Sequence, residues 1–235
     1  MKMSIAIPTW ESYGKGGEFL DDLLRTIEIQ TFKDFEVVIS DHSEDNNVFD
    51  KVGEFEDKFN LCYSKNKKDK GNGPSNTNRA IEMCSGDIIK VMFQDDFFYD
   101  DEALEKIYNE LSNSDKTWLV NGCNHTQDDG NSFYWEMYPR WNDNFLEGVN
   151  SISSPSVLSF KNNVENRFDT TLTYFMDCEF YYGMNEKYGQ PIFLNDVLVS
   201  NRVGDYSVTT NVSHKNRDYY VEKETKYCKE KYEAL

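Results

Sequence analysis

The sequence predicts an α/β protein with a mainly parallel sheet. Short apolar segments with strand character alternate with amphipathic helical segments through the first half of the 235 residues. Such alternation is typical of βαβ units, whose strands run parallel. The chain is long enough for a sizeable core, since 38% of its residues are hydrophobic and 15% aromatic. One of the predicted strands, Ile88–Phe93, leads into two adjacent carboxylates, Asp95 and Asp96.

Strands in the first half are predicted from short apolar runs rich in β-branched residues. They lie at Met3–Ile7, Phe35–Ser40, Leu61–Ser64, Ile88–Phe93 and Trp118–Asn121. Helices are predicted between them, where apolar residues recur at helical spacing. These helices span Glu18–Ile29, residues 48–59, a segment through Ala80 and Ile81 that follows Asn72-Gly73-Pro74, and residues 103–111. Because each helix links two strands, we expect right-handed crossovers.

The pattern changes near Gly122. The following segment is rich in aromatic residues, Asn and Ser, and contains two strand candidates, Phe133–Tyr138 and Val157–Phe160. Helices are predicted at Cys178–Tyr188, which Gly189 ends, and at Arg217–Glu233. We expect one domain over residues 1–235, made of a first half, 1–122, and a mixed second half, 123–235.

Composition excludes several classes of partner. The chain has 25 basic and 42 acidic residues, and its net charge of −17 repels nucleic acid and anionic membranes. The five cysteines are widely spaced without a CxxC pair, and the three histidines are scattered, so neither disulfides nor a zinc site is predicted. The apolar N-terminal segment is too short for a signal peptide, and no run could span a membrane. We expect a cytoplasmic protein without a transmembrane segment.

Polar residues gather where the predicted parallel strands end. These segments are Pro8-Thr9-Trp10-Glu11, Ser40-Asp41-His42-Ser43, Asn76-Thr77-Asn78-Arg79 and Gln94-Asp95-Asp96. Strand ends of a parallel sheet share one edge, where ligands bind. The first two can hold a base and ribose, and Arg79 can meet a base edge or a phosphate. The sequence has no GxGxxG or GxxxxGK[ST] loop, so a divalent cation on Asp95 and Asp96 would have to carry the phosphates.

The order and spacing of several motifs resemble the family 2 glycosyltransferases, inverting enzymes of the GT-A fold that use nucleotide-diphosphate sugars. The resemblance is strong over residues 3–112. It is carried by Ile5–Trp10, Gln30–Asp41, Asn78–Ile81, Gly86-Asp87 and Gln94–Asp96. Beyond Gly122, the Phe175–Phe180 segment followed by Tyr188-Gly189 looks like the acidic acceptor-side motif of the family. Arg202–Ser207 resembles its later Arg-x-His…Ser segment.

The resemblance implies metal-assisted transfer of a sugar from a UDP- or dTDP-sugar to a hydroxyl of a glycan or other acceptor, as in polysaccharide biosynthesis. Residues 1–122 would bind the nucleotide sugar and residues 123–235 the acceptor. The implied donor site is Pro8, Thr9, Trp10, Asp41, Arg79 and Asp95, with Asp41 accepting a hydrogen bond from the base. Asp95 and Asp96 would hold Mn²⁺ or Mg²⁺, with Asp96 as the expected direct ligand. Asp177 would be the catalytic base.

The sequence departs from the family pattern at three positions. Phe93 and His42 stand where many members have an acid, and Gly204 stands where a metal-binding His often lies. Asp205 or His214 could substitute for that histidine, or the metal could have fewer protein ligands.

Other interpretations of the same residues stay open. Asp41 and Asp177 could be helix caps, Arg79 a surface residue, and Glu179 the base in place of Asp177. Trp135 and Trp141 could be core residues or could stack on a sugar. At the level of the whole protein, a GT-A-like module that binds a nucleotide or glycan without turnover is one alternative. A nucleotidyltransferase is another, although the short Pro8-Thr9-Trp10 turn lacks the Gly-rich loop of that class.

Overall fold

The computed structural model describes residues 2–207, 210 and 216–233. Within these residues nine strands form one mixed sheet. In chain order they are β1 (Met3–Thr9), β2 (Phe35–Asp41), β3 (Asn60–Lys65), β4 (Ile88–Val91), β5 (Phe97–Phe98), β6 (Trp118–Thr126), β7 (Tyr134–Met137), β8 (Leu158–Lys161) and β9 (Ile192–Arg202). Their order across the sheet is β3-β2-β1-β4-β8-β6-β9-β5, and β7 pairs with β6.

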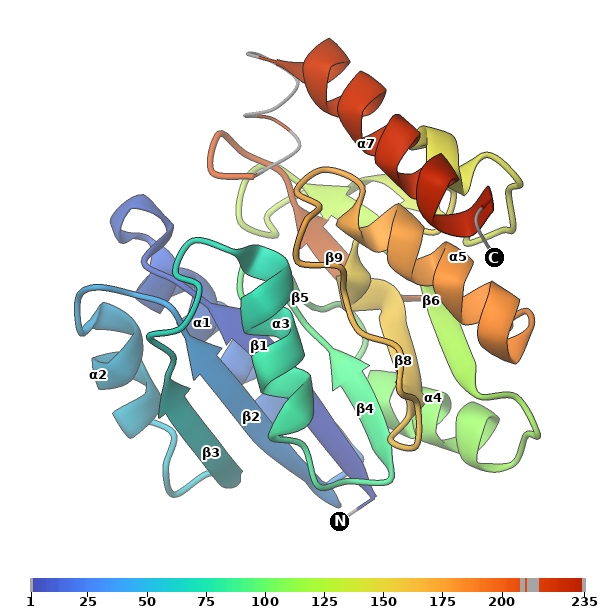
Figure 1. The fold of residues 1–235 in the computed structure, drawn as a ribbon. Coiled ribbons are helices and arrows are strands. Elements are labelled where there is room, and N and C mark those ends of the chain that lie inside the picture. Colours follow the sequence, from blue (N-terminus) through green and yellow to red (C-terminus); the bar gives the residue numbers. More distant parts are fainter. Residues whose placement is uncertain (1, 208–209, 211–215, 234–235) are drawn as a thin grey trace.

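Helices flank this sheet on both faces (Figure 1). They are α1 (Gly16–Glu28), α2 (Asn47–Gly53), α3 (Gly73–Glu82), α4 (Ala103–Ser112), α5 (Met176–Tyr188) and α7 (Arg217–Glu233), with short 3₁₀ turns η1 (Ser12–Gly14), η2 (Phe145–Glu147) and η3 (Pro155–Val157). Helix α3 packs in front of β1 and β2, whereas α4 lies behind β8. Among the helices of the described residues, none is both long enough and apolar enough to cross a lipid bilayer.

The first half has the parallel order that the alternating pattern predicts. Strand β1 pairs in parallel with both β2 and β4, and β2 pairs in parallel with β3. The chain moves outward from β1 to β3 and then returns to the other side of β1. The strand order therefore reverses between β1 and β4, which is where open α/β sheets form their ligand crevice.

The second half extends the same sheet with both strand directions. Strand β8 is antiparallel to β4 and to β6, between which it lies. Strand β9 runs parallel to β6, and the short β5 closes the edge antiparallel to β9. Both halves of the chain thus supply strands to one sheet, and the predicted α/β class is confirmed.

Strand β9 is an eleven-residue strand that the apolar pattern does not predict. Its register against β6 shifts, because Asn121 pairs with Leu194 but the next residue, Gly122, pairs with Val197. Asn195 and Asp196 form the resulting bulge. Two polar residues in the middle of the strand interrupt the period-two alternation by which strands are found in a sequence.

Helix α2 is shorter than the predicted segment 48–59. It ends at Gly53, and turns continue the chain to β3. Phe55 is nonetheless buried, and its ring packs on Phe59 with a centroid distance of 6.0 Å. The helical spacing of these aromatic residues therefore reflects their contact with the core from turns rather than from a helix.

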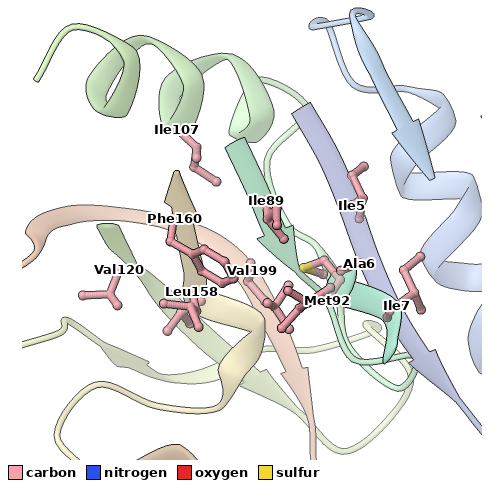
Figure 2. Packing of buried hydrophobic residues seen from close by; sticks show 14 of the residues in the cluster. Ile5, Ala6, Ile7, Ile89, Met92, Ile107, Val120, Leu158, Phe160 and Val199 are labelled. Carbon is pink, nitrogen blue, oxygen red and sulfur yellow. The ribbon is translucent and has the colours of Figure 1, made fainter. Parts of the chain in front are cut away.

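The core lies between the sheet and its helices. Figure 2 shows Ile107 of α4 directed toward Ile89 of β4 and Phe160 of β8, with Val120 and Leu158 beside them. All five side chains are buried. This packing makes the strands a rigid support for the polar loops at their carboxyl ends.

Gly86, just before β4, lies in close contact with the backbone of β1. A Cβ atom at Gly86 would lie 2.6 Å from the carbonyl carbon of Met3 and 2.8 Å from the backbone nitrogen of Ser4. We therefore expect Gly86→Ala to lower the free energy of unfolding by about 1–3 kcal/mol in urea denaturation. The matched control is Gly53→Ala, since a Cβ at Gly53 meets nothing within 4 Å. It should be neutral or stabilising by up to about 1 kcal/mol, and equal stability of the two variants would contradict the prediction.

Candidate active site

The end of β1 is fastened to the turn that carries the two acids. The backbone N–H of Trp10 donates to Gln94 Oε1 at 2.8 Å, and Gln94 Nε2 donates to the Trp10 carbonyl at 2.9 Å. Trp10 is partly exposed, and its ring packs edge-on against Tyr13 at a centroid distance of 5.2 Å. Pro8 lies one position before the buried Thr9, in register with Ser40 of β2. The structure thus brings three predicted donor-site residues to the edge of the sheet where β1 ends.

Asp41, at the end of β2, is fully buried and heavily hydrogen-bonded. Its Oδ1 accepts from the Thr9 hydroxyl at 3.2 Å and from the backbone N–H and hydroxyl of Ser43. Its Oδ2 accepts from the Tyr63 hydroxyl at 2.7 Å and from Lys65 Nζ at 3.1 Å. Burial acts to raise the pKa of Asp41, but these donors outweigh it and lower the pKa below its usual value. Asp41 does not cap α2, which begins six residues later.

Asn76, which lies in the predicted rim segment Asn76-Thr77-Asn78-Arg79, joins β1, β2 and α3. Its Nδ2 donates to the Thr9 carbonyl at 3.0 Å and to the Ser40 carbonyl at 2.9 Å, while its Oδ1 accepts from the Ser40 hydroxyl at 2.8 Å. Arg79, on the same helix, is exposed and pairs with Glu82 at 3.7 Å. Within the described residues Arg79 makes no bond to the other predicted site residues, and its contact with a nucleotide stays a prediction.

Asp95 and Asp96 follow β4 at the carboxyl ends of the parallel strands. The buried Asp96 accepts from the backbone N–H of Arg202 at 3.0 Å and from the Ser154 hydroxyl at 3.2 Å. Asp95 is partly buried, and within the described part of the chain no other residue donates a hydrogen bond to it. Burial raises the pKa of both acids, and the charge of Asp96 raises that of Asp95 further. Two adjacent carboxylates with raised pKa values form a fitting donor set for a hard divalent cation.

A third protein ligand from the predicted positions does not join these two acids. Over residues 2–207, 210 and 216–233, no cluster of three or more His, Cys, Asp or Glu side chains is arranged to hold a metal. Gly204 packs against the Tyr206 ring, and a Cβ there would lie 2.3 Å from it. Asp205 lies on an exposed turn, and His214 lies outside the described residues. The set that the described residues offer is therefore a pair of carboxylates.

Asp177 lies in the first turn of α5, where its carboxylate is bonded to Asn150. Its Oδ2 accepts from Asn150 Nδ2 at 2.7 Å, and its Oδ1 accepts from the N–H of Cys178 at 2.7 Å. Burial raises the pKa of Asp177 to about 6, because these bonds only partly offset the loss of water. A carboxylate with this pKa can take up a proton near neutral pH.

Glu179 lies on the same helix but is bound to α7, which packs beside α5 (Figure 1). Its Oε1 accepts from Lys231 Nζ at 2.8 Å and from the Tyr232 hydroxyl at 2.6 Å. The side chain is buried at this helix contact. The geometry therefore gives Glu179 a structural partner and leaves Asp177 as the acid that faces the 150–154 segment.

A second acid of α7 positions the start of α5. Glu224 is buried and its carboxylate accepts from the backbone N–H groups of Thr173, Tyr174 and Phe175 at 3.0, 3.0 and 2.7 Å. These N–H groups directly precede the helix and would otherwise lack acceptors. The last helix of the described chain thus fixes the turn that presents Asp177.

Residues 150–154, here called the strap, connect the acids of the two halves. Asn150 bonds Asp177, and Ser154 bonds both Asp96 and Asn201 Oδ1. Between them, Ser153 has a φ of 109°, a strained conformation for a residue with a side chain. The strap is held in place by the Tyr181 hydroxyl, which donates to the Ser153 and Ser154 carbonyls at 3.1 Å each. Its only sequence signal is a polar run that ends at Pro155.

Comparison with solved structures finds the same fold in several glycosyltransferases. S. aureus TarS 1–349 superimposes with a TM-score of 0.69 at 18% identity, covering 86% of this chain and 60% of TarS 1–349. The same protein in complex with UDP-GlcNAc gives a TM-score of 0.70 at 18% identity, over 87% of this chain and 59% of that one. The mannosyltransferase PcManGT from Pyrobaculum calidifontis, in complex with GDP-Man and Mn²⁺, gives 0.64 at 15% identity, over 87% and 57%. The chain thus spans about three fifths of these solved chains.

The sequence comparison agrees with this fold. No curated protein matches the chain. A family model described as glycosyl transferase family 2 matches residues 4–181, which include β1 except its first residue, the acidic turn and Asp177. This match covers well over half of the sequence, and the GT-A fold of the solved relatives is the fold that the sequence predicted. The chain therefore belongs to glycosyl transferase family 2.

Proposed function

We propose that the protein transfers a sugar from a nucleoside diphosphate donor, UDP or dTDP, to a hydroxyl of a glycan or other acceptor, with inversion at the anomeric carbon. The observation that carries this proposal is the strap, which ties Asp96 and Asp177 to one short segment. One acid belongs to the donor side and the other to the acceptor side. Membership of the family supports the reaction class.

The proposed reaction needs one base and one leaving group. Asp177 takes the proton of the acceptor hydroxyl while the acceptor oxygen forms a bond to the anomeric carbon. The bond between that carbon and the diphosphate breaks, and the nucleoside diphosphate leaves with the electron pair. Attack from the face opposite the leaving group inverts the configuration. A pKa of about 6 keeps Asp177 ionised at neutral pH while leaving it basic enough to assist the attack.

Asp95 and Asp96 would hold Mn²⁺ or Mg²⁺ together with the diphosphate. Such cations are commonly bound through one or two carboxylates plus substrate phosphates, which suits a site with two protein ligands. A bound cation would stabilise the charge that develops on the departing diphosphate. Among the described residues Asp95 has no competing donor, and Asp96 is kept in place by Arg202 and Ser154. The complex of the relative PcManGT with Mn²⁺ supports a divalent cation here.

The donor side is proposed for residues 1–122 and the acceptor side for residues 123–235 of a single domain. Thr9, Trp10 and Asp41 surround the proposed nucleoside site. For Asp41 to accept an N–H from a pyrimidine, one of its present donors must move away, and Tyr63 and Lys65 are the two that are partly exposed. TarS and PcManGT were solved with UDP-GlcNAc and GDP-Man respectively, so solved relatives bind more than one nucleotide. We infer a cytoplasmic reaction, since all five cysteines are unpaired thiols.

Asp177 and Glu179 should affect stability in opposite ways. The raised pKa of Asp177 means that its ionised form destabilises the fold as pH rises through about 6. Asp177→Asn cannot ionise, so its stability relative to wild type should increase between pH 5 and pH 8 in urea denaturation. Glu179→Gln loses the charge that binds Lys231 and should be less stable than wild type by about 1–3 kcal/mol at pH 8. A pH-independent difference for Asp177→Asn would contradict the burial argument.

Asp177 should carry the base function. General base assistance is worth about 10²–10⁴-fold in rate, so Asp177→Asn should reduce sugar transfer by that factor with donor affinity nearly unchanged. For wild type, kcat/KM should fall as pH drops below about 6, because Asp177 becomes protonated. This fall of kcat/KM at low pH should be absent in Asp177→Asn. Glu179→Gln, assayed below its unfolding temperature, is the control. It should keep both the wild-type rate of sugar transfer and the fall of kcat/KM at low pH. Loss of transfer only in the Glu179 variant would place the base there.

Asp96 should be required for cation-dependent donor binding. Asp96→Asn keeps one oxygen to accept from the Arg202 N–H, and its amide nitrogen can donate to the Ser154 hydroxyl, but it lacks the charge that a divalent cation needs. Thermal shifts of wild type with UDP or dTDP should exceed those with ADP and should depend on Mn²⁺. The variant should lose the Mn²⁺-dependent part, whereas the exposed control Asp115→Asn should retain it. Equal Mn²⁺ dependence in Asp96→Asn would refute the metal site, and a preference for ADP would refute the pyrimidine assignment.

A further inference from the structure

Strand β7 presents two large aromatic rings to solvent. Trp135 is 66% exposed and Tyr134 is 41% exposed, and both rings lie against the ring of His125 on β6. The Trp135 and His125 rings are stacked, with centroids 4.9 Å apart and an interplanar angle of 15°. We call these three residues the aromatic platform. Trp135 gains little from burial, so the core does not account for its position.

A bulge directs Trp135 into this position. His125 pairs with Tyr134 and Cys123 with Met137, so a step of two residues on β6 corresponds to three on β7. Trp135 lies in this bulge, and its φ is 45°. This backbone conformation is costly for a residue with a bulky side chain. Its carbonyl is bonded to His125 Nδ1 at 2.9 Å, which holds the strained backbone in place. Bulges next to functional sites commonly re-aim a side chain in this way.

The platform is connected to both acids of the proposed reaction. Beyond β7, the N–H of Arg140 donates to the Ser151 carbonyl at 3.1 Å, and the Ser151 hydroxyl donates to the Arg140 carbonyl at 2.7 Å. Ser151 belongs to the strap that bonds Asp96 and Asp177. On the other side, His125 is in register with Asn201 of β9, one residue before Arg202. Two strand spacings, about 10 Å, therefore separate β7 from the strand whose Arg202 N–H binds Asp96.

We propose that the aromatic platform binds a neutral carbohydrate chain, the acceptor of the proposed transferase, at sugar units beyond the one that reacts. This inference rests on the proposed function, because the bound carbohydrate is an acceptor only if the protein transfers a sugar to it. An exposed indole offers a flat apolar face to the C–H face of a sugar ring. The neighbouring Glu136 is exposed and its carboxylate accepts from the Tyr138 hydroxyl, which adds polar groups for sugar hydroxyls. The net charge of −17 disfavours an anionic chain.

Trp141 is a different kind of residue from Trp135. It is partly buried, its ring packs on Phe145 at a centroid distance of 4.9 Å, and its Nε1 donates to Asp143 Oδ1 at 3.0 Å. Of the two tryptophans that could stack on a sugar, the structure assigns that role to Trp135 and a packing role to Trp141.

The test is a calorimetric titration of the full chain, with and without UDP, using cellotetraose, maltotetraose, mannotetraose and chitotetraose. Wild type should bind at least one of them, and Trp135→Ala should weaken that binding about tenfold, which corresponds to about 1.4 kcal/mol. Trp135→Gly should behave alike, and because glycine tolerates a positive φ it keeps the bulge. The control is Tyr219→Ala, which removes a ring that is 59% exposed on α7 and should leave tetrasaccharide binding unchanged. UDP affinity should be equal in all four proteins.

Equal tetrasaccharide binding by wild type and both Trp135 variants would overturn the inference, as would no binding of any tetrasaccharide by wild type. If sedimentation shows a wild-type dimer that the Trp135 variants lose without a change in tetrasaccharide binding, the platform is a contact between copies and the inference is also overturned. Failure of the proposed function is separate: wild type would then bind neither UDP nor dTDP, while the tetrasaccharide comparison still decides the role of Trp135.

Discussion

The arrangement of the site depends on how Asp96 is held. Its two oxygens accept from the backbone of β9 and from the hydroxyl of Ser154, so one carboxylate joins the first parallel strands to the last strand and to the strap. The same strap bonds Asp177 through Asn150. A shift of the acidic turn would therefore move the strap and, through Asn150, Asp177 on α5. The fold thus couples the two acids through a short run of hydrogen bonds rather than through direct contact.

The acids of this site show how the number of donors, and not burial alone, sets acidity. Asp41 is buried and Asp177 is partly buried, yet the pKa of Asp41 is lowered and that of Asp177 is raised to about 6. Asp41 is surrounded by hydroxyl, ammonium and backbone donors, whereas Asp177 has one amide side chain and one backbone N–H. A permanently charged acid suits an architectural or recognition role. An acid that titrates near neutrality suits proton transfer.

Much of this arrangement is predictable from the sequence, because it follows from local pattern. The apolar runs that end in Thr9, Asp41 and the Asp95-Asp96 pair predict both the parallel strands and the edge at which these residues meet. What sequence reasoning misses are the long-range hydrogen bonds, both of Asn76, which lies in a predicted rim segment, and of Ser154, which does not. Asn76 binds segments 36 and 67 positions away, and Ser154 binds Asp96 58 positions away. No periodicity encodes such pairs. Strand β9 is missed for a local reason, since its bulge removes the alternation.

The capping of α5 by Glu224 has a consequence for where the functional unit ends. The family match stops at residue 181, whereas Glu224 lies on α7, well beyond that boundary. A polypeptide cut at the family boundary would retain every acid assigned to donor and acceptor, yet it would leave the three N–H groups before α5 without their carboxylate. The motifs that define the family and the parts that keep those motifs in register are thus different stretches of the chain. Sequence variation in the last helix should therefore alter the position of Asp177, although the residues proposed to react lie on other elements.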